Sequence, residues 1–168
     1  ELMVNQYQDE RSQNVYSIID KSRTMRMPFN NLTLLDYAIN STLAFSNIIL
    51  KKGDKVGLMT YSNKLGAKLK AERNGNQLMK IMELLFHQKT QFLEANFDLL
   101  YQGIRNHIKG RSLIMLYTNI ESEYSLKRIL PLLKRINQKH LLVVIFFENT
   151  EVEKTAKIQP KNISDIYL

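Results

Sequence analysis

The 168-residue sequence contains no cysteine and no tryptophan, and only three prolines and six glycines. Without cysteine the chain can form neither a disulfide framework nor a thiolate zinc site, and a cysteine nucleophile is excluded. Stability must therefore come from packing, for which an apolar content of 44% is sufficient in a chain of this length. The absence of cysteine also fits a reducing compartment, so we expect a cytoplasmic location.

Long apolar runs are missing as well. No stretch of about 18 apolar residues occurs, and no basic segment followed by an apolar one opens the sequence, so neither a membrane span nor a secretory signal is predicted. The sequence starts at Glu1 rather than at a methionine, and Ser164-Asp165 resembles a helix cap close to its end. We therefore expect residues 1–168 to be a single domain taken from a longer chain.

The common catalytic signatures are also absent. The sequence has no Gly-x-x-x-x-Gly-Lys phosphate loop, no Gly-x-Gly-x-x-Gly turn, no Gly-x-Ser-x-Gly elbow and no His-Glu-x-x-His zinc motif. The three histidines, His87, His107 and His140, are far apart in sequence, and we interpret them as surface or helix-end residues. These absences favour a binding domain over an enzyme.

The net charge of +8 suits an acidic partner or a polyanion, because clustered basic side chains release counterions from phosphates. The basic residues are scattered, however, with pairs at positions 51–52, 68 and 70, 127–128 and 134–135. No nucleic-acid motif and no basic tract interleaved with aromatic residues is present. A solvated basic surface is therefore favoured over nucleic-acid binding.

Apolar runs that are typical of buried strands alternate with segments of helical periodicity. Strands are predicted at 15–19, 55–61, 65–72, 112–118 and 141–147, and helices at 35–50, 78–85, 97–108 and 126–136. Thr33 and Asp36 form an approximate capping box, and Pro131 is expected to kink or restart the last helix. This order predicts an α/β, Rossmann-like three-layer sandwich with a mostly parallel sheet and residues 65–72 as an antiparallel edge strand.

The segment Asp20-Lys21-Ser22-Arg23-Thr24 stands where the first strand ends. Alternate residues of an extended segment face the same side, so the carboxylate and the two hydroxyls should converge there. Three converging oxygens suit a hard cation such as Mg²⁺. Alternatively, Asp20 and Ser22 merely cap a turn. In open parallel sheets ligands bind beyond the carboxyl ends of the strands, which directs attention to the loops after Asp20, Phe92 and Thr118.

Asp20, Ser22 and Thr24 match the Asp-x-Ser-x-Thr opening of the metal-ion-dependent adhesion site, and the chain resembles the von Willebrand factor A fold that carries this site. Segments 33–38, 53–58, 110–114 and 140–144 are similar to one bacterial branch, the domain-of-unknown-function family fifty-eight. Residues 1–7 resemble the segment by which that family enters the domain. The resemblance covers almost the whole chain.

The resemblance implies two further site residues, a threonine from a second loop and an aspartate that follows a threonine after the next central strand. Counting back from Leu99-Leu100 places Glu94 at the threonine position, with Thr90 as the fallback, and Asn119 occupies the aspartate position. The implied site for Mg²⁺ or Mn²⁺ therefore consists of Asp20, Ser22, Thr24, Glu94 and Asn119. Either Glu94 restores the charge that Asn119 lacks, or the site has decayed and the domain binds partners without metal.

The function implied by the resemblance is protein–protein interaction, in which an acidic side chain of the partner supplies the last metal ligand. The branch further implies an adaptor or chaperone-like role beside AAA+ ATPases of the MoxR type, and in many members an upstream region includes membrane-spanning helices. Two alternatives remain. One is a metal-dependent hydrolase or phosphotransfer enzyme that uses Asp20 as nucleophile or base, and the other is a nucleic-acid binder.

Overall fold

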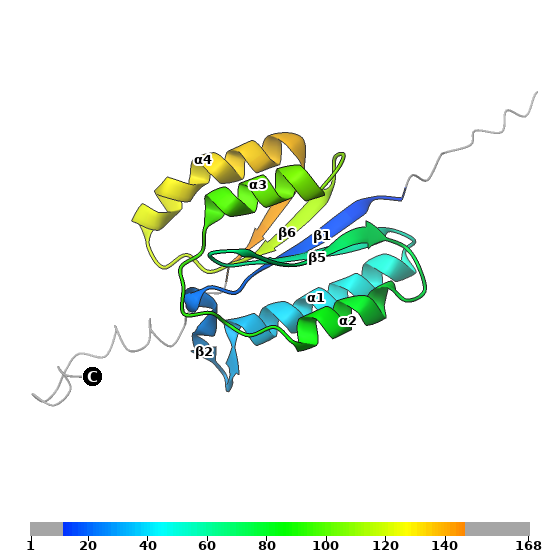
Figure 1. Cartoon of the computed structure of the whole chain (residues 1–168), viewed down its shortest axis with the longest axis horizontal. Coiled ribbons are helices and arrows are strands. Elements are labelled where there is room, and N and C mark those ends of the chain that lie inside the picture. Colours follow the sequence, from blue (N-terminus) through cyan, green and yellow to red (C-terminus); the bar gives the residue numbers. More distant parts are fainter. Residues whose placement is uncertain (1–11, 147–168) are drawn as a thin grey trace, which may run out of the picture.

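A central five-stranded sheet organises the computed structural model, which describes residues 12–146. The strand order is β5-β4-β1-β6-β7, formed by β1 (Asn14–Asp20), β4 (Lys55–Tyr61), β5 (Leu65–Glu72), β6 (Leu113–Tyr117) and β7 (Leu141–Ile145). Figure 1 shows α1 (Leu34–Lys51) and α2 (Gln77–Phe86) on one face of this sheet, with α3 (Phe97–His107) and α4 (Glu123–Lys139) on the other. No helix in this described part is long and apolar enough to span a bilayer.

The strand directions give the sheet its functional edge. β1 pairs in parallel with β4 on one side and with β6 on the other, β6 pairs in parallel with β7, and β5 runs antiparallel to β4. The chain therefore leaves β1 toward β4 through α1 and later returns on the other side of β1 to form β6. The strand order reverses between β1 and β6, the position where such sheets bind ligands. The predicted three-layer sandwich with one antiparallel edge strand is confirmed.

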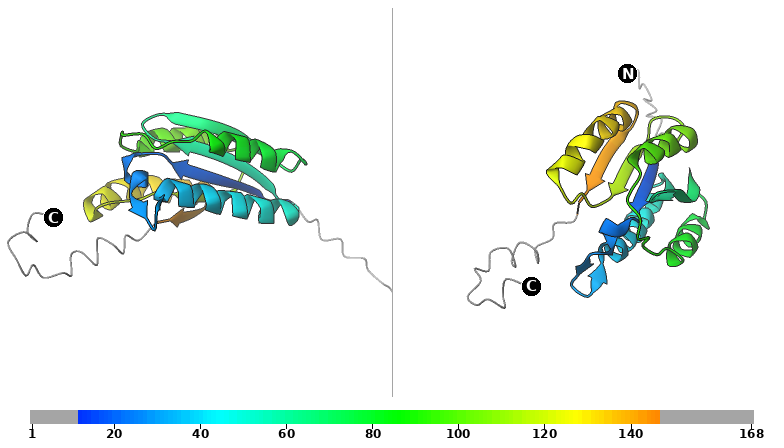
Figure 2. Two further views of the ribbon diagram at one scale, coloured as in Figure 1. Left: turned by 90° about the horizontal axis from the view of Figure 1, so that it is seen from below. Right: turned by 60° about the vertical axis from the view of Figure 1, so that its left-hand side comes forward.

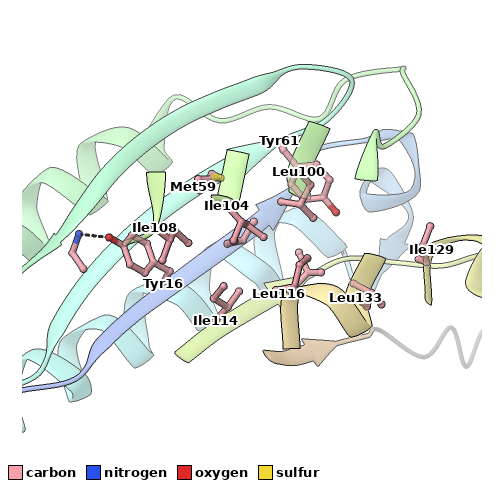
Figure 3. Packing of buried hydrophobic residues seen from close by; sticks show 13 residues of the cluster. Tyr16, Met59, Tyr61, Leu100, Ile104, Ile108, Ile114, Leu116, Ile129 and Leu133 are labelled. Atoms are coloured by element: carbon pink, nitrogen blue, oxygen red, sulfur yellow. Dashed lines mark hydrogen bonds between the residues drawn. The ribbon is translucent and has the colours of Figure 1, made fainter. Parts of the chain in front are cut away.

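Side chains along each strand alternate between the two layers of the core. Tyr16 and Ile18 of β1 pack with α3 and α4, whereas Ile19 packs with α1 and α2. Figure 3 shows the first cluster, in which the Tyr16 hydroxyl accepts a hydrogen bond of 3.2 Å from the backbone N–H of Ala71 in the edge strand β5. Because Asp20 continues the alternation from Tyr16 and Ile18, its side chain faces the same side of the sheet.

The capping box predicted at the start of the first long helix is confirmed. The Thr33 hydroxyl accepts from the backbone N–H of Asp36 at 3.2 Å, and the Asp36 carboxylate accepts from the backbone N–H of Thr33 at 2.8 Å. These two bonds satisfy donors that the first turn of a helix leaves unpaired. The helix ends at Lys51, after which Gly53, at φ +91°, turns the chain into β4.

The segment after β1, expected to be a polar loop, contains regular structure. A 3₁₀ helix η1 (Arg23–Arg26) is followed by a small hairpin of β2 (Pro28–Phe29) and β3 (Leu32–Thr33). Asn30 and Asn31 form its tip with φ of 47° and 68°, a left-handed conformation that asparagine tolerates. Figure 2 shows η1 and the hairpin beyond the carboxyl end of β1. The signal for this hairpin is the Asn-Asn pair between the short segments Pro28–Phe29 and Leu32–Thr33.

Two other expectations differ from the structure. Pro131 does not restart the last helix, because α4 is continuous from Glu123 to Lys139. Pro131 lies on the exposed side, where water can satisfy the carbonyl that loses its hydrogen bond. β7 ends at Ile145, whereas the predicted strand reached Phe147, which lies outside the described residues. Ser164-Asp165 and residues 1–7 also lie outside them.

Candidate functional site

The candidate site begins at the carboxyl ends of β1 and β6, on the left of Figure 1. Asp20 is the last residue of β1 and is fully buried. One oxygen of its carboxylate accepts from the backbone N–H of Ser22 at 2.7 Å, and the other accepts from the Thr118 hydroxyl at 2.8 Å. Thr118 follows β6 directly, so these bonds tie together the two strands between which the strand order reverses.

The two predicted hydroxyls meet, but not by strand alternation. Ser22 is buried and extended, with φ −67° and ψ 174°, whereas Thr24 already belongs to the 3₁₀ helix η1. The turn of η1 brings the Thr24 hydroxyl oxygen to 3.0 Å from that of Ser22. The interpretation of all five residues as one extended segment was therefore wrong after Ser22. The convergence of the side chains was nevertheless predicted correctly.

The second loop, residues 88–96, is held against the first by backbone hydrogen bonds. The Gln91 N–H donates to the Lys21 carbonyl at 2.7 Å, and the Arg23 N–H donates to the Leu93 carbonyl at 3.0 Å. These two bonds place the end of the second loop, including Glu94, beside η1. Asn96 then caps α3, because its side chain accepts from the backbone N–H of Leu99 at 3.0 Å.

Three of the predicted ligands line one hollow at this edge, which we call the edge hollow. They are Thr24, Glu94 and Asn119, from the first loop, the second loop and the segment after β6. The edge hollow has a volume of about 90 Å³. Thr90, the fallback position, does not line it. Asp20 and Ser22 are buried and connect to the hollow through Thr24.

Asn119 is oriented by the first loop. Its side-chain N–H group is within 3.4 Å of the Thr24 carbonyl oxygen and within 3.4 Å of the Met27 sulfur. With the amide nitrogen directed at these acceptors, the amide oxygen is the atom left to act as an acceptor or metal ligand. Asn119 therefore links the segment after β6 to η1 and brings an oxygen without charge.

Burial governs the electrostatics beneath the edge hollow. Loss of solvent raises the pKa of Asp20 above its usual value of 3.8, and the bonds from Ser22 and Thr118 offset part of that rise. Tyr61, which lies opposite Asp20 in the neighbouring strand, is fully buried, and burial together with the Asp20 charge raises its pKa well above 10.0. Tyr61 therefore stays neutral at physiological pH, and any charge of the pair resides on Asp20.

The donor atoms at this edge fit a hard divalent cation. Mg²⁺ takes about six oxygen ligands, commonly one or two carboxylates with waters and neutral oxygens. Asp20 and Glu94 offer carboxylates, Ser22 and Thr24 offer hydroxyls, and Asn119 offers an amide oxygen. Among the described residues no cluster of three or more His, Cys, Asp or Glu side chains suited to a metal is found.

Exposed aromatic and basic side chains that sequence reasoning missed occur in the segments that form the edge hollow. Phe92 is 74% exposed, and the Arg26 guanidinium lies 4.4 Å from the centroid of its ring. Tyr124, at the start of α4, is 79% exposed. Arg23 and Glu121, which both line the hollow, form an exposed ion pair of 3.5 Å. Aromatic residues and arginine are enriched in protein interfaces, so Phe92-Leu93 in a polar loop was the available signal.

No protein-family model matches the chain, and no curated protein matches it in sequence.

Solved structures do match the fold. The SpRpn10 VWA domain aligns with a TM-score of 0.57 at 17% identity over 85% of this chain and 79% of that one. The conserved hypothetical protein BatB from Bacteroides thetaiotaomicron aligns with a TM-score of 0.55 at 12% identity, over 79% of this chain and 65% of its own. The vWF domain of the type V pili tip protein Mfa5 from Porphyromonas gingivalis aligns with a TM-score of 0.53 at 17% identity, over 64% of this chain and 37% of its own. The chain has the fold of von Willebrand factor A domains.

Proposed function

We propose that this domain is a protein-interaction module whose partner binds at the carboxyl edge of the sheet, through a divalent cation held at the edge hollow. The ligands are Asp20, Ser22, Thr24, Glu94 and Asn119, and the ion is Mg²⁺ or Mn²⁺. The observation that carries this proposal is the convergence of Thr24, Glu94 and Asn119 on one hollow where the strand order reverses.

The exposed side chains of the segments that form the hollow support a protein rather than a small molecule as the ligand. Arg23 lines the hollow, and the largely exposed Phe92 and Tyr124 and the exposed Arg26 belong to the same segments as its lining residues; aromatic residues and arginine are typical of interface centres. In this proposal the cation binds a carboxylate of the partner, and the neighbouring aromatic and arginine side chains contact the partner around that carboxylate.

We further propose that the partner is an AAA+ ATPase of the MoxR type and that the domain acts as an adaptor in the cytoplasm. This step rests on the sequence resemblance of segments 33–38, 53–58, 110–114 and 140–144. A net charge of +8 would assist the approach of an acidic partner, because long-range attraction raises association rates.

Binding is favoured over catalysis by the state of Asp20. A nucleophile or general base must contact the reacting atoms directly, whereas Asp20 is fully buried with both oxygens accepting hydrogen bonds, so in this proposal it acts on a partner only through the cation. Its buried neighbour Tyr61 stays neutral and so provides no second base at physiological pH. We therefore propose that the domain makes and breaks no covalent bond.

A metal-independent interaction domain is the second candidate, favoured by a specific observation. The hydrogen bonds from Ser22 and Thr118 satisfy the Asp20 carboxylate without a cation. Asn119 in turn brings no charge to the position where the family carries aspartate. In this case the same edge binds the partner through Phe92, Tyr124 and the arginines alone.

The experiment is equilibrium binding of the purified chain to the MoxR-type ATPase from the same organism, in millimolar Mg²⁺ and in chelator. We expect binding that chelator abolishes, and loss of binding with Glu94→Ala but not with the matched control Thr90→Ala, which lies in the same loop outside the hollow. Binding that survives chelator and Glu94→Ala would select the metal-independent candidate. No binding under either condition would refute the ATPase as partner.

A further inference from the structure

Among residues 12–146, the helices on the α1 face of the sheet cover β1, β4 and β5 but not β7. α1 packs against β1 and β4, and α2 packs against β4 and β5. The helix that packs against β7 is α4, on the opposite face (Figure 2). Strands of parallel sheets are normally buried on both faces. The α1 side of β7 is therefore an exception within this sheet.

The side chains on this side of β7 are apolar and exposed. Leu142 and Val144 pack in the cluster that contains α3 and α4, so Leu141, Val143 and Ile145 point to the α1 face. Leu141 is 56% exposed and Val143 is 43% exposed. β7 is the last strand of the described sheet, and it contains neither the charged residues nor the proline that commonly protect such an edge.

One side of α1 continues this apolar surface. The Ser41 hydroxyl oxygen lies 3.4 Å from the Tyr117 hydroxyl oxygen, so this side of the helix faces β6. Phe45 and Ile48 follow Ser41 at helical spacing on the same side, and they are 44% and 49% exposed. Because α1 returns from the carboxyl edge of the sheet to the amino edge, both side chains lie beside the amino-terminal half of β6, next to β7.

Four exposed apolar side chains thus define a surface that we call the open face: Phe45, Ile48, Leu141 and Val143. The elements that form it carry no charge there, because α1 has no charged residue between Asp36 and Lys51, and β7 has none. Apolar contacts rather than ion pairs must therefore hold whatever covers the open face.

The chain itself contains an apolar segment that is long enough and close enough to cover this surface. Residues 163–168 have the sequence Ile-Ser-Asp-Ile-Tyr-Leu, in which four of the side chains are aliphatic or aromatic. Residues 146–162 connect β7 to this segment. A connection of that length spans up to about 60 Å when extended, whereas a strand of five residues is only about 17 Å long. The segment can therefore reach every part of the open face.

We infer that residues 163–168 dock on the open face of the same molecule, with their aliphatic and aromatic side chains packed on Phe45, Ile48, Leu141 and Val143. A covalent connection favours this occupant over a second copy of the chain, because a short tether gives an effective concentration in the millimolar range. The inference is independent of the cation proposed at the carboxyl edge of the sheet.

A nitroxide label tests the docking directly, because the chain contains no cysteine and one introduced cysteine carries the label at a single place. Ser164→Cys puts the label at a polar position of the segment. In the ¹⁵N-labelled chain it should broaden the amide signals of Phe45 and Val143 most, and those of β5, four strands away from β7, least. The control label is Gly75→Cys, where an added Cβ meets no atom within 4 Å; it should broaden signals of β5 and not those of β7.

Substitutions on the open face should release the segment. Leu141→Ser combined with Val143→Ser should weaken docking by up to about tenfold per residue and restore the Phe45 signal in the chain labelled at position 164. The matched control combines Met79→Ser with Met82→Ser, two exposed apolar positions of α2, and should leave the broadening unchanged. The ¹⁵N spectrum of each variant reports whether it is folded.

A mixed sample separates docking within one molecule from docking between two. It contains ¹⁵N-labelled chain without nitroxide and ¹⁴N chain with nitroxide at position 164. The inference predicts broadening of the open face in the singly labelled chain and none in the mixture. Equal broadening in the mixture would assign the open face to a second copy and overturn the inference. Absence of broadening in both samples, broadening that survives the paired serine substitutions, or broadening of β7 by the label at position 75 would overturn it as well.

Discussion

The two ends of the central sheet bury polar groups in different ways. At the carboxyl end the Asp20 carboxylate is fully buried, and no Lys, Arg or His among the described residues pairs with it. At the amino end the buried polar residues are neutral. Ser112 donates to the Gly110 carbonyl at 3.3 Å, and burial, with a smaller contribution from Lys139, lowers the pKa of His140, which favours its neutral form.

This comparison distinguishes two kinds of buried polar residue. Ser112 and His140 are neutral, whereas Asp20 carries an ionisable carboxylate that has no basic partner among the described residues. A neutral polar group that satisfies a turn costs little to bury, whereas an ionised carboxylate without a counter-charge is expensive. Such a cost, at the edge where open parallel sheets generally bind ligands, favours a functional role for the group. Substitutions at Asp20 and at its hydrogen-bond partners should therefore change the stability of the fold differently from substitutions at the amino end.

The largest expected effect is the loss of the hydroxyl that supports Asp20. Thr118→Val removes a buried donor to a carboxylate, and in chelator it should lower the free energy of unfolding by about 1.5–3 kcal/mol. At the amino end Ser112→Ala removes a long, partly exposed bond and should cost less than about 1 kcal/mol. Chemical denaturation of both variants measures the contrast. Equal losses at the two ends would mean that the Asp20 carboxylate is not held as a charge.

The second prediction concerns Asp20 itself. Because its pKa is raised in the folded state above the usual 3.8, its ionised form destabilises the fold at neutral pH. Asp20→Asn should therefore melt at a higher temperature than the wild type in chelator at pH 7. The difference should shrink as the pH falls through the raised pKa and vanish near the unfolded value. A variant that is less stable than the wild type at every pH would contradict a strained carboxylate.

The third and smallest effect is expected at His140 and has the opposite sign. Its pKa is lowered from 6.5 in the folded state, so the stability it contributes is present above pH 6.5 and is lost as the pH falls below that value. Thermal melts of His140→Gln should lack this loss. If wild type and variant keep a constant difference from pH 7.5 to pH 5, His140 does not titrate as a buried group.

The fold was predictable because the turn-forming residues and the apolar periodicity indicate the same element boundaries along most of the chain. The predicted strands at 55–61 and 65–72 coincide with β4 and β5, since the Gly53-Asp54 turn and the short polar hairpin delimit them. Pro131 lies inside α4, which is continuous from Glu123 to Lys139, so of the two predicted alternatives the restart does not occur. The β2–β3 hairpin is too short for periodicity to reveal.

The site was predictable only in part. Asp20 follows from the end of an apolar strand, but Thr24 reaches Ser22 through η1, a turn that strand alternation does not anticipate. Glu94 reaches the hollow because backbone hydrogen bonds join the second loop to the first. Such bonds can form between almost any residues, so the amino-acid sequence does not reveal them. The hydroxyl bond from Thr118 to Asp20 joins segments that only the sheet order brings together.

The most direct test of the cation site is the melting temperature of the wild type and of Asp20→Ala, each in chelator and in millimolar Mg²⁺ or Mn²⁺. A ligand that binds only the folded state adds RT ln(1 + [L]/Kd), about 2.7 kcal/mol at a hundredfold excess over Kd, which raises Tm by several degrees in a chain of this size. We predict this rise for the wild type and none for Asp20→Ala. An unchanged wild-type Tm would contradict metal binding at this edge, and an equal rise in both proteins would place the metal elsewhere.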